Sequence, residues 1–326
     1  MAKLQAKMDK RWDKMSGMLK DWTEDHSARF QKEIMLFEHG LNESGLFTDA
    51  ALITLLNKHP SDLLDVCTMG EIENNLYPNR FQTGDFRGVD GKVLLDAAKA
   101  GKIWVNVRQG MNVHPEYKAV LDQMYGGIAE KTGNKAYNAN GGILISSPIA
   151  RVPYHFDKTE TILWHVRGKK SMYLYPQTEK FIPDQAYEAT MLTNLDDDLP
   201  YLPEFDEEAT VVKIEEGQAL TWPLNMPHRV DNQTFCVSVT TEYSTRESGM
   251  KNAAMIANAT LRQKFGIEPS YRNAGPLNRK IKSVFGRVIK KAGLAAKNDM
   301  VDMVTFKLDA SAPDFIVNVE PYQRNF

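Results

Sequence analysis

The sequence has little cysteine, no long apolar run and almost no net charge. Its two cysteines, Cys67 and Cys236, lie far apart, which excludes a disulfide framework and the close spacing of a zinc site. No apolar stretch reaches the ~18 residues that cross a bilayer, and the charged start MAKLQAKMDKRWDK is not typical of a signal peptide. We therefore expect a globular, cytoplasmic protein that does not enter a membrane.

The net charge of −2 over 326 residues gives no global attraction to nucleic acid, but it conceals two segments of opposite sign. Residues 184–216 hold eleven acidic residues against one lysine, and 276–297 hold seven basic residues and no acid. The acidic segment predicts a solvated insertion loop. The basic segment predicts a helix with a cationic, solvated face; a dimer-forming helix pair is the second interpretation, and contact with nucleic acid, which we do not expect, is the third.

The chain changes character near residue 141. Helical patterns cover residues 49–58, with Thr48 as a candidate cap, and then 91–100 and 115–132. From residue 141 short β-rich runs follow one another between turn signals such as Arg167-Gly168. This spacing predicts an antiparallel sandwich or barrel over 141–245, which includes the acidic insertion. Helical regions at 1–140 and 246–326 are expected to flank it.

One short segment carries most of the chemical information. In PYHFD, residues 153–157, His155 and Asp157 are two residues apart, and side chains two apart on an extended chain point to the same face. His228, from a later strand, can complete the set. Two neutral imidazoles and one carboxylate form the facial triad of non-haem iron(II) sites. His155, Asp157 and His228 are therefore candidate metal ligands and catalytic residues; for the short motif alone, a hydrogen-bonded histidine in a surface turn is the alternative.

The sequence around His228 supports the metal site. It is PLNMPHRVDN, which resembles the second cupin motif, P-x-G-x-x-H-x-x-x-N, with Asn225 in place of the glycine. Asparagine adopts the left-handed backbone conformation more readily than other residues with a side chain. The departure from the motif is therefore tolerable, and a tight turn is expected to project His228 into the barrel.

A lysine follows the metal motif on the next hairpin. Lys170, Met172 and Leu174 share one face of the returning strand. A lysine buried in a barrel needs an anionic partner, because an unpaired buried charge is costly. The free carboxylate of a metal-bound keto-acid is such a partner. The alternative is that Lys170, like Lys169, belongs to a solvated turn.

Together these residues resemble the JmjC-type, cupin-fold 2-oxoglutarate and iron(II)-dependent oxygenases, in particular hydroxylases like factor inhibiting HIF and bacterial cupin-like proteins. The resemblance covers 141–176 and 217–241. It implies a mainly β core with α flanks: a double-stranded β-helix (cupin/JmjC jelly roll) with helical N- and C-terminal extensions. It implies that His155, Asp157 and His228 hold iron and that Lys170 binds the far carboxylate of 2-oxoglutarate. Thr161 and Thr240 match further cofactor-binding positions.

The resemblance also implies a reaction. A dioxygenase of this family consumes O2 and 2-oxoglutarate, hydroxylates a peptide or protein side chain, and releases succinate and CO2. The same chemistry on a small metabolite such as a free amino acid is an alternative. A metal-binding cupin without oxygenase activity, acting as an isomerase or a sensor, is another. Because the resembling hydroxylases often dimerise through C-terminal helices, a homodimer is expected from the basic region.

One residue departs from the family pattern. Val152 stands three residues before His155, where the family has a threonine or serine whose hydroxyl holds the co-substrate. We expect Tyr137 or Tyr154 to supply a hydroxyl instead. Four aromatic residues near the motif are expected to wall the pocket: Trp164, Tyr173, Tyr175 and Trp222. His165 is interpreted as a hydrogen-bonded structural residue.

Overall fold

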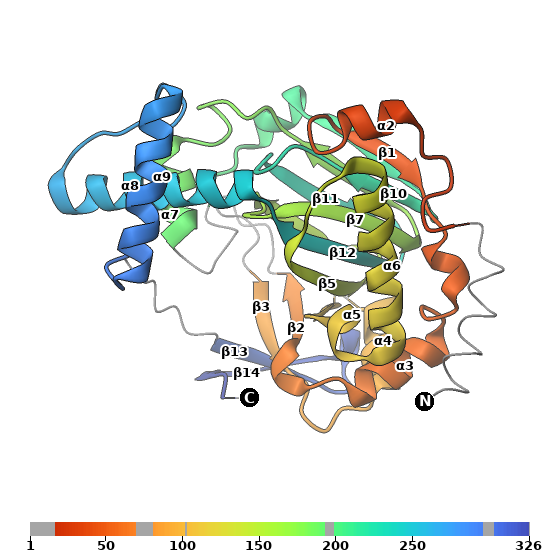
Figure 1. Ribbon diagram of the computed structural model, residues 1–326. Helices are drawn as coiled ribbons and strands as arrows, with labels where there is room; N and C mark the ends of the chain where they lie inside the picture. The colour runs from red at the N-terminus through yellow and green to blue at the C-terminus, as the bar shows by residue number, and fades with distance from the viewer. Residues whose placement is uncertain (1–16, 70–80, 102, 193–198, 296–302, 326) are drawn as a thin grey trace.

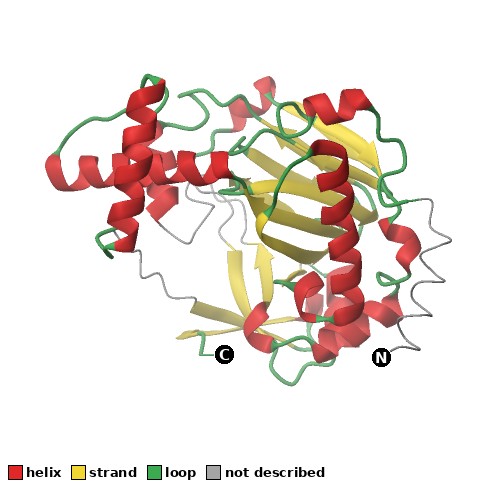
Figure 2. Cartoon of the chain, in the orientation of Figure 1, coloured by secondary structure: helices red, strands yellow, loops and turns green. Residues whose placement is uncertain are grey.

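Two β-sheets lie at the centre of the molecule and helices lie outside them (Figure 1, Figure 2). The structure is a computed structural model that describes residues 17–69, 81–101, 103–192, 199–295 and 303–325. Within these ranges the large sheet has ten strands in the order β1-β10-β7-β12-β5-β4-β2-β3-β13-β14, and the small sheet has four in the order β6-β11-β8-β9.

The strands of the large sheet are β1 (Met35–Glu38), β2 (Leu64–Met69), β3 (Phe81–Asp85), β4 (Ile103–Val107), β5 (Tyr137–Ser146), β7 (Glu160–Arg167), β10 (Gln218–Thr221), β12 (Cys236–Ser244), β13 (Met303–Leu308) and β14 (Ile316–Gln323). Those of the small sheet are β6 (Arg151–His155), β8 (Lys170–Leu174), β9 (Thr210–Ile214) and β11 (His228–Asn232).

From β5 to β12 the chain passes back and forth between the two sheets. Strands β5, β7, β10 and β12 lie in the large sheet, and β6, β8, β9 and β11 lie in the small one, each paired antiparallel with its neighbours. This is a double-stranded β-helix, as expected. Its interior is an apolar cluster contributed by both sheets: Leu163, Met172, Leu174, Ile214, Leu220, Trp222 and Val230.

Strand β7 shows why the central strands are buried on both faces. Its residues Glu160–Val166 are all buried, because helices cover the outer face of the large sheet while the small sheet covers the inner face. Leu163 belongs to the barrel interior, whereas its neighbours Ile162 and Trp164 belong to the core beneath the helices. A strand with large apolar residues on both faces does not reveal from its sequence which face points inward.

The N-terminal helices begin and end as the sequence predicts. They are α3 (Asp49–Lys58), α4 (Gly91–Ala100) and α6 (Pro115–Thr132), and two shorter helices, α2 (Glu24–Arg29) and α5 (Gly110–Val113), accompany them. Thr48 caps α3 by accepting a hydrogen bond from the Ala51 amide. Gly133 ends α6 in the left-handed conformation, at φ 71°.

The flanking regions contain strands that the sequence reading did not predict. Residues 1–140 were expected to be helical, yet β1, β2, β3 and β4 lie there; in the C-terminal region β13 and β14 extend the same sheet. These short strands are specified by their partners: β4 pairs with β5 of the barrel, and β2 pairs with β4. Residues 1–16, part of the region expected to be helical, lie outside the described residues.

The acidic segment 184–216 is not a solvated loop throughout. It contains α7 (Asp184–Leu192), a short 3-10 helix (Pro203–Glu208) and β9, while residues 193–198 lie outside the described residues. Two of its acids pair with arginines from the C-terminal region. Buried Glu188 accepts a hydrogen bond from Arg262 at 2.8 Å, and Asp184 pairs with Arg272. Ion pairing across distant segments therefore allows the acidic helix to pack.

Most apolar residues of the basic C-terminal helix do not pack against the rest of the molecule. Helix α9 (Pro276–Lys291) crosses α8 (Arg246–Phe265), as Figure 1 shows, with Ser283, Gly286 and Ile289 buried. A Cβ on Gly286 would lie 1.7 Å from the carbonyl oxygen of Ala253, so the close crossing requires glycine. The apolar row is exposed: Leu277, Ile281, Val284, Phe285 and Val288. The expectation that this row packs inward, leaving a cationic solvated face, was wrong.

No helix in the described ranges has both the length and the apolar character of a membrane span.

Candidate metal centre

Three candidate ligands meet where β6 and β11 lie side by side. His155 ends β6, Asp157 follows it by two residues, and His228 begins β11. His228 is the direct antiparallel partner of His155, and residues directly opposite each other point to the same face of a sheet. The sheet pairing therefore brings together two imidazoles that are far apart in the sequence.

The three side chains converge on one point. One ligand atom from each of His155, Asp157 and His228 lies within 4.8 Å of the others. The His155 Nε2 is 3.8 Å from one carboxylate oxygen of Asp157, and the His228 Nε2 is 3.7 Å from the other. Both separations exceed hydrogen-bond length, so the groups surround a shared space instead of bonding to one another.

Backbone carbonyls fix the direction of both imidazoles. The His155 Nδ1 lies 2.7 Å from the carbonyl oxygen of Pro153, and the His228 Nδ1 lies 2.9 Å from that of Met226. A carbonyl oxygen can only accept, so each Nδ1 carries the hydrogen and donates it. Each Nε2 therefore directs a lone pair at the shared space, which is the arrangement of a metal-binding histidine.

Burial keeps His228 neutral. Its side chain is almost fully buried, the Trp222 ring lies 4.9 Å from its own, and the His155 ring lies 4.3 Å away. Burial first, and then repulsion from His155, hold the pKa of His228 well below its ordinary value of 6.5. Two imidazoles and one carboxylate that converge on one point fit a divalent iron ion.

The side chain of Asn225 makes hydrogen bonds that the sequence motif did not predict. Its backbone is left-handed, at φ 61°, as the turn before His228 requires. Its side-chain amide also donates to the backbone carbonyl of Asp157 at 2.7 Å, and its Oδ1 accepts the hydroxyl of Tyr187 at 2.6 Å. A glycine in this position would form the turn without holding the Asp157 segment.

Lys170 lies on the inner face of the barrel and is not part of a solvated turn. It shares this face with Met172 and Leu174, and its side chain is almost fully buried. Burial lowers the pKa of its ammonium group, and no carboxylate in the described part of the chain pairs with it. Lys169 differs, because it is exposed and pairs with Glu215 at 3.1 Å.

The other candidate co-substrate residues also face the interior. Thr161 is buried on the Leu163 face of β7, and Thr240 is the direct partner of Leu163 on β12. Val152 packs against the interior cluster, so an apolar side chain occupies the place where the family has a hydroxyl.

Neither expected substitute for that hydroxyl lies in place. Tyr154 donates to the carbonyl of Phe181 at 2.7 Å, outside the small sheet, and Tyr137 is 55% exposed. His165 is buried and bonded to Ser238 and the carbonyl of Gly168, as expected of a structural histidine.

Of the four aromatic residues expected to wall the pocket, one faces the barrel interior. Trp222 belongs to the interior cluster. Trp164 packs under the N-terminal helices, and Tyr173 and Tyr175 pack outside the small sheet. Strand alternation is the reason, since Tyr173 and Tyr175 have the opposite parity to Leu174 on β8.

No family model matches the chain, and neither does any curated protein sequence. Among solved structures the chain is similar to Escherichia coli ycfD, with 15% identity over 85% of this chain and 69% of that chain and a TM-score of 0.49. It is also similar to YcfD described as a ribosomal oxygenase in complex with cobalt and 2-oxoglutarate, with 15% identity over 85% of this chain and 69% of that chain and a TM-score of 0.48. For the YcfD complex with cobalt and succinic acid, the identity is 13% over 88% of this chain and 74% of that chain, and the TM-score is 0.46. At these identities and TM-scores, function has to be inferred from this chain's own residues.

The Asn225 hydrogen bonds generate a prediction about metal affinity. Asn225→Gly keeps the left-handed turn but removes the donor to Asp157, so metal affinity should fall about tenfold or more, as is typical when a residue supporting a ligand is lost. Isothermal titration calorimetry with Fe(II) under anaerobic conditions measures the metal affinity. Asn225→Asp, which keeps an acceptor for Tyr187 but loses the donor, should behave similarly. Unchanged affinity in both variants would show that this hydrogen bond does not support the site.

Proposed function

We propose that this protein is a 2-oxoglutarate- and iron(II)-dependent dioxygenase that hydroxylates a peptide or protein side chain and releases succinate and CO2. The observation that carries this proposal is the convergence of two Nε2 lone pairs and one carboxylate at His155, His228 and Asp157. Buried Lys170 on the same inner face adds a cation that lacks an acidic partner among the described residues.

In this proposal His155, Asp157 and His228 hold iron(II) and are the catalytic residues. When bound, the iron with O2 and 2-oxoglutarate supplies the oxidising power for hydroxylation of a C–H bond. The chain's own contribution is positional. The Pro153 and Met226 carbonyls keep both imidazoles in the ligand tautomer, and the apolar interior around Trp222 and Leu174 excludes water.

Lys170 provides the second half of the site. We assign it the far carboxylate of 2-oxoglutarate, because a buried ammonium group without an acidic neighbour is costly until an anion binds. Thr161 and Thr240 share the interior face and are assigned to the same co-substrate pocket. Val152 supplies no hydroxyl, so Lys170 carries a larger share of co-substrate recognition than in enzymes with threonine or serine there.

The substrate class rests on the sequence resemblance, which favours a peptide or protein side chain over a free amino acid. A metal-binding cupin acting as an isomerase or a sensor is the alternative from another class, and Val152 favours it. Lys170 distinguishes the two, because only a keto-acid-dependent enzyme needs a buried cation there. The absence of a disulfide at Cys67 and Cys236 supports a reducing compartment, and we propose the cytoplasm.

Turnover tests the proposed activity. With Fe(II), O2 and 2-oxoglutarate, wild-type protein should release succinate, and Asp157→Ala should reduce release to background because a ligand is lost. Asp122→Ala, an exposed carboxylate on α6, is the matched control and should behave as wild type. If the wild type neither binds 2-oxoglutarate nor releases succinate with peptides or free amino acids, the oxygenase proposal fails.

The assignment of Lys170 has its own test. Lys170→Met should leave metal affinity unchanged and weaken 2-oxoglutarate binding by about tenfold to a hundredfold, because a charge-assisted hydrogen bond is lost. Calorimetry with Mn(II)-loaded protein measures both affinities. Lys169→Met removes the same charge from the exposed neighbouring position and should bind 2-oxoglutarate as wild type does. Tight binding to Lys170→Met would refute this role.

We propose that the exposed apolar row of α9 forms a homodimer. Of the fifteen large apolar residues exposed in the described ranges, eight lie between residues 265 and 294. Leu277, Ile281, Val284 and Val288 recur every three or four residues along α9 and so form one stripe. A stripe of this kind on a soluble surface marks an interaction site, and a second copy offers a matching stripe.

Molar mass in solution tests the dimer. Light scattering during size-exclusion chromatography should give twice the chain mass of 36.9 kDa. Ile281→Asp combined with Val288→Asp should give the monomer mass, because two charges are placed in the apolar contact. Ile149→Asp, at an equally exposed apolar position outside this region, is the control and should remain dimeric. A monomeric wild-type protein would contradict the proposal.

A further inference from the structure

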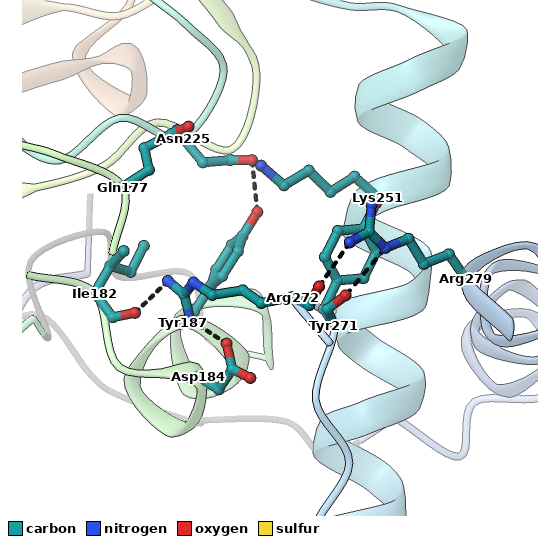
Figure 3. Close-up of a pocket in the computed structure, with 9 residues that line it drawn as sticks. All are labelled: Gln177, Ile182, Asp184, Tyr187, Asn225, Lys251, Tyr271, Arg272 and Arg279. Atoms are coloured by element: carbon teal, nitrogen blue, oxygen red, sulfur yellow. Dashed lines mark hydrogen bonds and ion pairs between the residues drawn. The ribbon is translucent and has the colours of Figure 1, made fainter. Parts of the chain in front are cut away.

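A cavity lies outside the barrel, between α7, α8 and the start of α9 (Figure 3). Its volume is about 170 Å³. Its charged lining residues are Asp184, Lys251, Arg272 and Arg279, and Gln177, Tyr187, Asn225 and Tyr271 complete the polar part of the wall. Three cations against one acid make this cavity strongly positive.

One of the three cations is already neutralised. Arg272 donates to Asp184 and to Glu179, and a further bond joins its guanidinium to the carbonyl of Ile182. These bonds use the single acid in the lining. Lys251 and Arg279 form no ion pair with any acid in the described residues.

Lys251 is held in the cavity without a polar partner. Its ammonium group lies 5.5 Å from the centre of the Tyr187 ring, and Figure 3 shows the side chain extending from α8 toward Asn225 and the hydroxyl end of Tyr187. Burial first, and then repulsion from Arg272, lower its pKa to about 8, while Glu247 and Glu160 act on it only through space. The described groups therefore leave its charge incompletely compensated.

Arg279 is fixed in position by neutral groups. Its Nε donates to the carbonyl of Tyr271 at 3.0 Å, its Nη2 donates to that of Arg272 at 2.8 Å, and its guanidinium lies 4.7 Å from the centre of the Tyr271 ring. Within the described residues its Nη1 makes no hydrogen bond. Two carbonyls and an aromatic face thus orient a full positive charge that keeps a donor for a ligand.

This cavity does not adjoin the barrel interior that Lys170 faces. Tyr187 and Ile182 belong to the apolar cluster outside the small sheet, whereas Met172 and Leu174, on the Lys170 face, belong to the barrel interior. The cavity is nevertheless connected to the candidate metal ligand Asp157, because Asn225 in the cavity wall donates a hydrogen bond to the backbone carbonyl of Asp157. A molecule bound in this cavity would therefore lie behind the backbone segment that carries Asp157.

We propose that this cavity binds a small oxyanion, a phosphate or carboxylate group, between Lys251 and Arg279. The charge supports this, because an oxyanion accepts several hydrogen bonds and neutralises two cations that otherwise repel each other. The size supports it too: the cavity is smaller than the roughly 300 Å³ at which sites for drug-sized molecules begin. The donors are of the two kinds that recognise phosphate and carboxylate, a point-charge lysine and a planar arginine.

The test is calorimetric titration of the full-length, metal-free protein with inorganic phosphate and, separately, with acetate at constant ionic strength. Saturable binding of at least one anion is expected, and the two titrations decide between phosphate and carboxylate. Lys251→Met should weaken binding about tenfold or more, because a charge-assisted bond is lost. Lys280→Met, which removes an exposed charge from α9, should bind as wild type does.

Two further variants make the test decisive. Arg279→Gln should also weaken anion binding. Because Arg279 holds the backbone of residues 271 and 272, the thermal unfolding of Arg279→Gln is measured as well. If Arg279→Gln is unstable, the result for Lys251→Met decides. Lys170→Met should keep phosphate affinity, which separates this site from the 2-oxoglutarate pocket and keeps the result independent of the oxygenase proposal. No saturable binding of either anion, or equal affinity in Lys251→Met and wild type, would overturn the site.

Discussion

The antiparallel pairing of β6 with β11 is the constraint on which the rest of the site depends. It places His228 directly opposite His155, and Asp157, two residues beyond the end of β6, lies beside both imidazoles. The neighbouring strand β8 pairs with the other edge of β11, so Leu174 lies next to His228 and Lys170 follows on the same face. One strand, β11, thus aligns the candidate metal ligands with the buried lysine.

Within the described residues, His155 and His228 each keep one ring nitrogen without a hydrogen bond, and Lys170 keeps its ammonium group without an acidic partner. Buried polar groups normally find partners, and most do here: His165 is bonded at both ring nitrogens, and Asn225 at both side-chain atoms. His155 and His228 are instead bonded at Nδ1 only, with Nε2 directed at Asp157. Lys170 has no acidic partner in the described ranges. In the proposed function, a metal binds at the open Nε2 atoms and Asp157, and an anion pairs with Lys170.

Patterns that depend on neighbouring residues were predictable from the sequence. The period of two in β6 gave His155 and Asp157 a common face, the preference of asparagine for left-handed backbone gave the turn at Asn225, and Thr48 and Gly133 marked helix ends. Features set by distant partners were not predictable. Helical spacing groups Leu277 with Ile281 and Val284, but the small residues Ser283 and Gly286 decide that the opposite face packs. Likewise, Lys251 and Arg279 meet only because α9 crosses α8.

The most direct test of the central claim is a crystal structure with Mn(II), as a stable substitute for iron(II), and 2-oxoglutarate bound. The proposed function predicts metal density about 2 Å from the Nε2 atoms of His155 and His228 and from a carboxylate oxygen of Asp157. It also predicts the far carboxylate of 2-oxoglutarate within hydrogen-bond distance of the Lys170 ammonium group. Metal bound elsewhere, or 2-oxoglutarate bound away from Lys170, would contradict it.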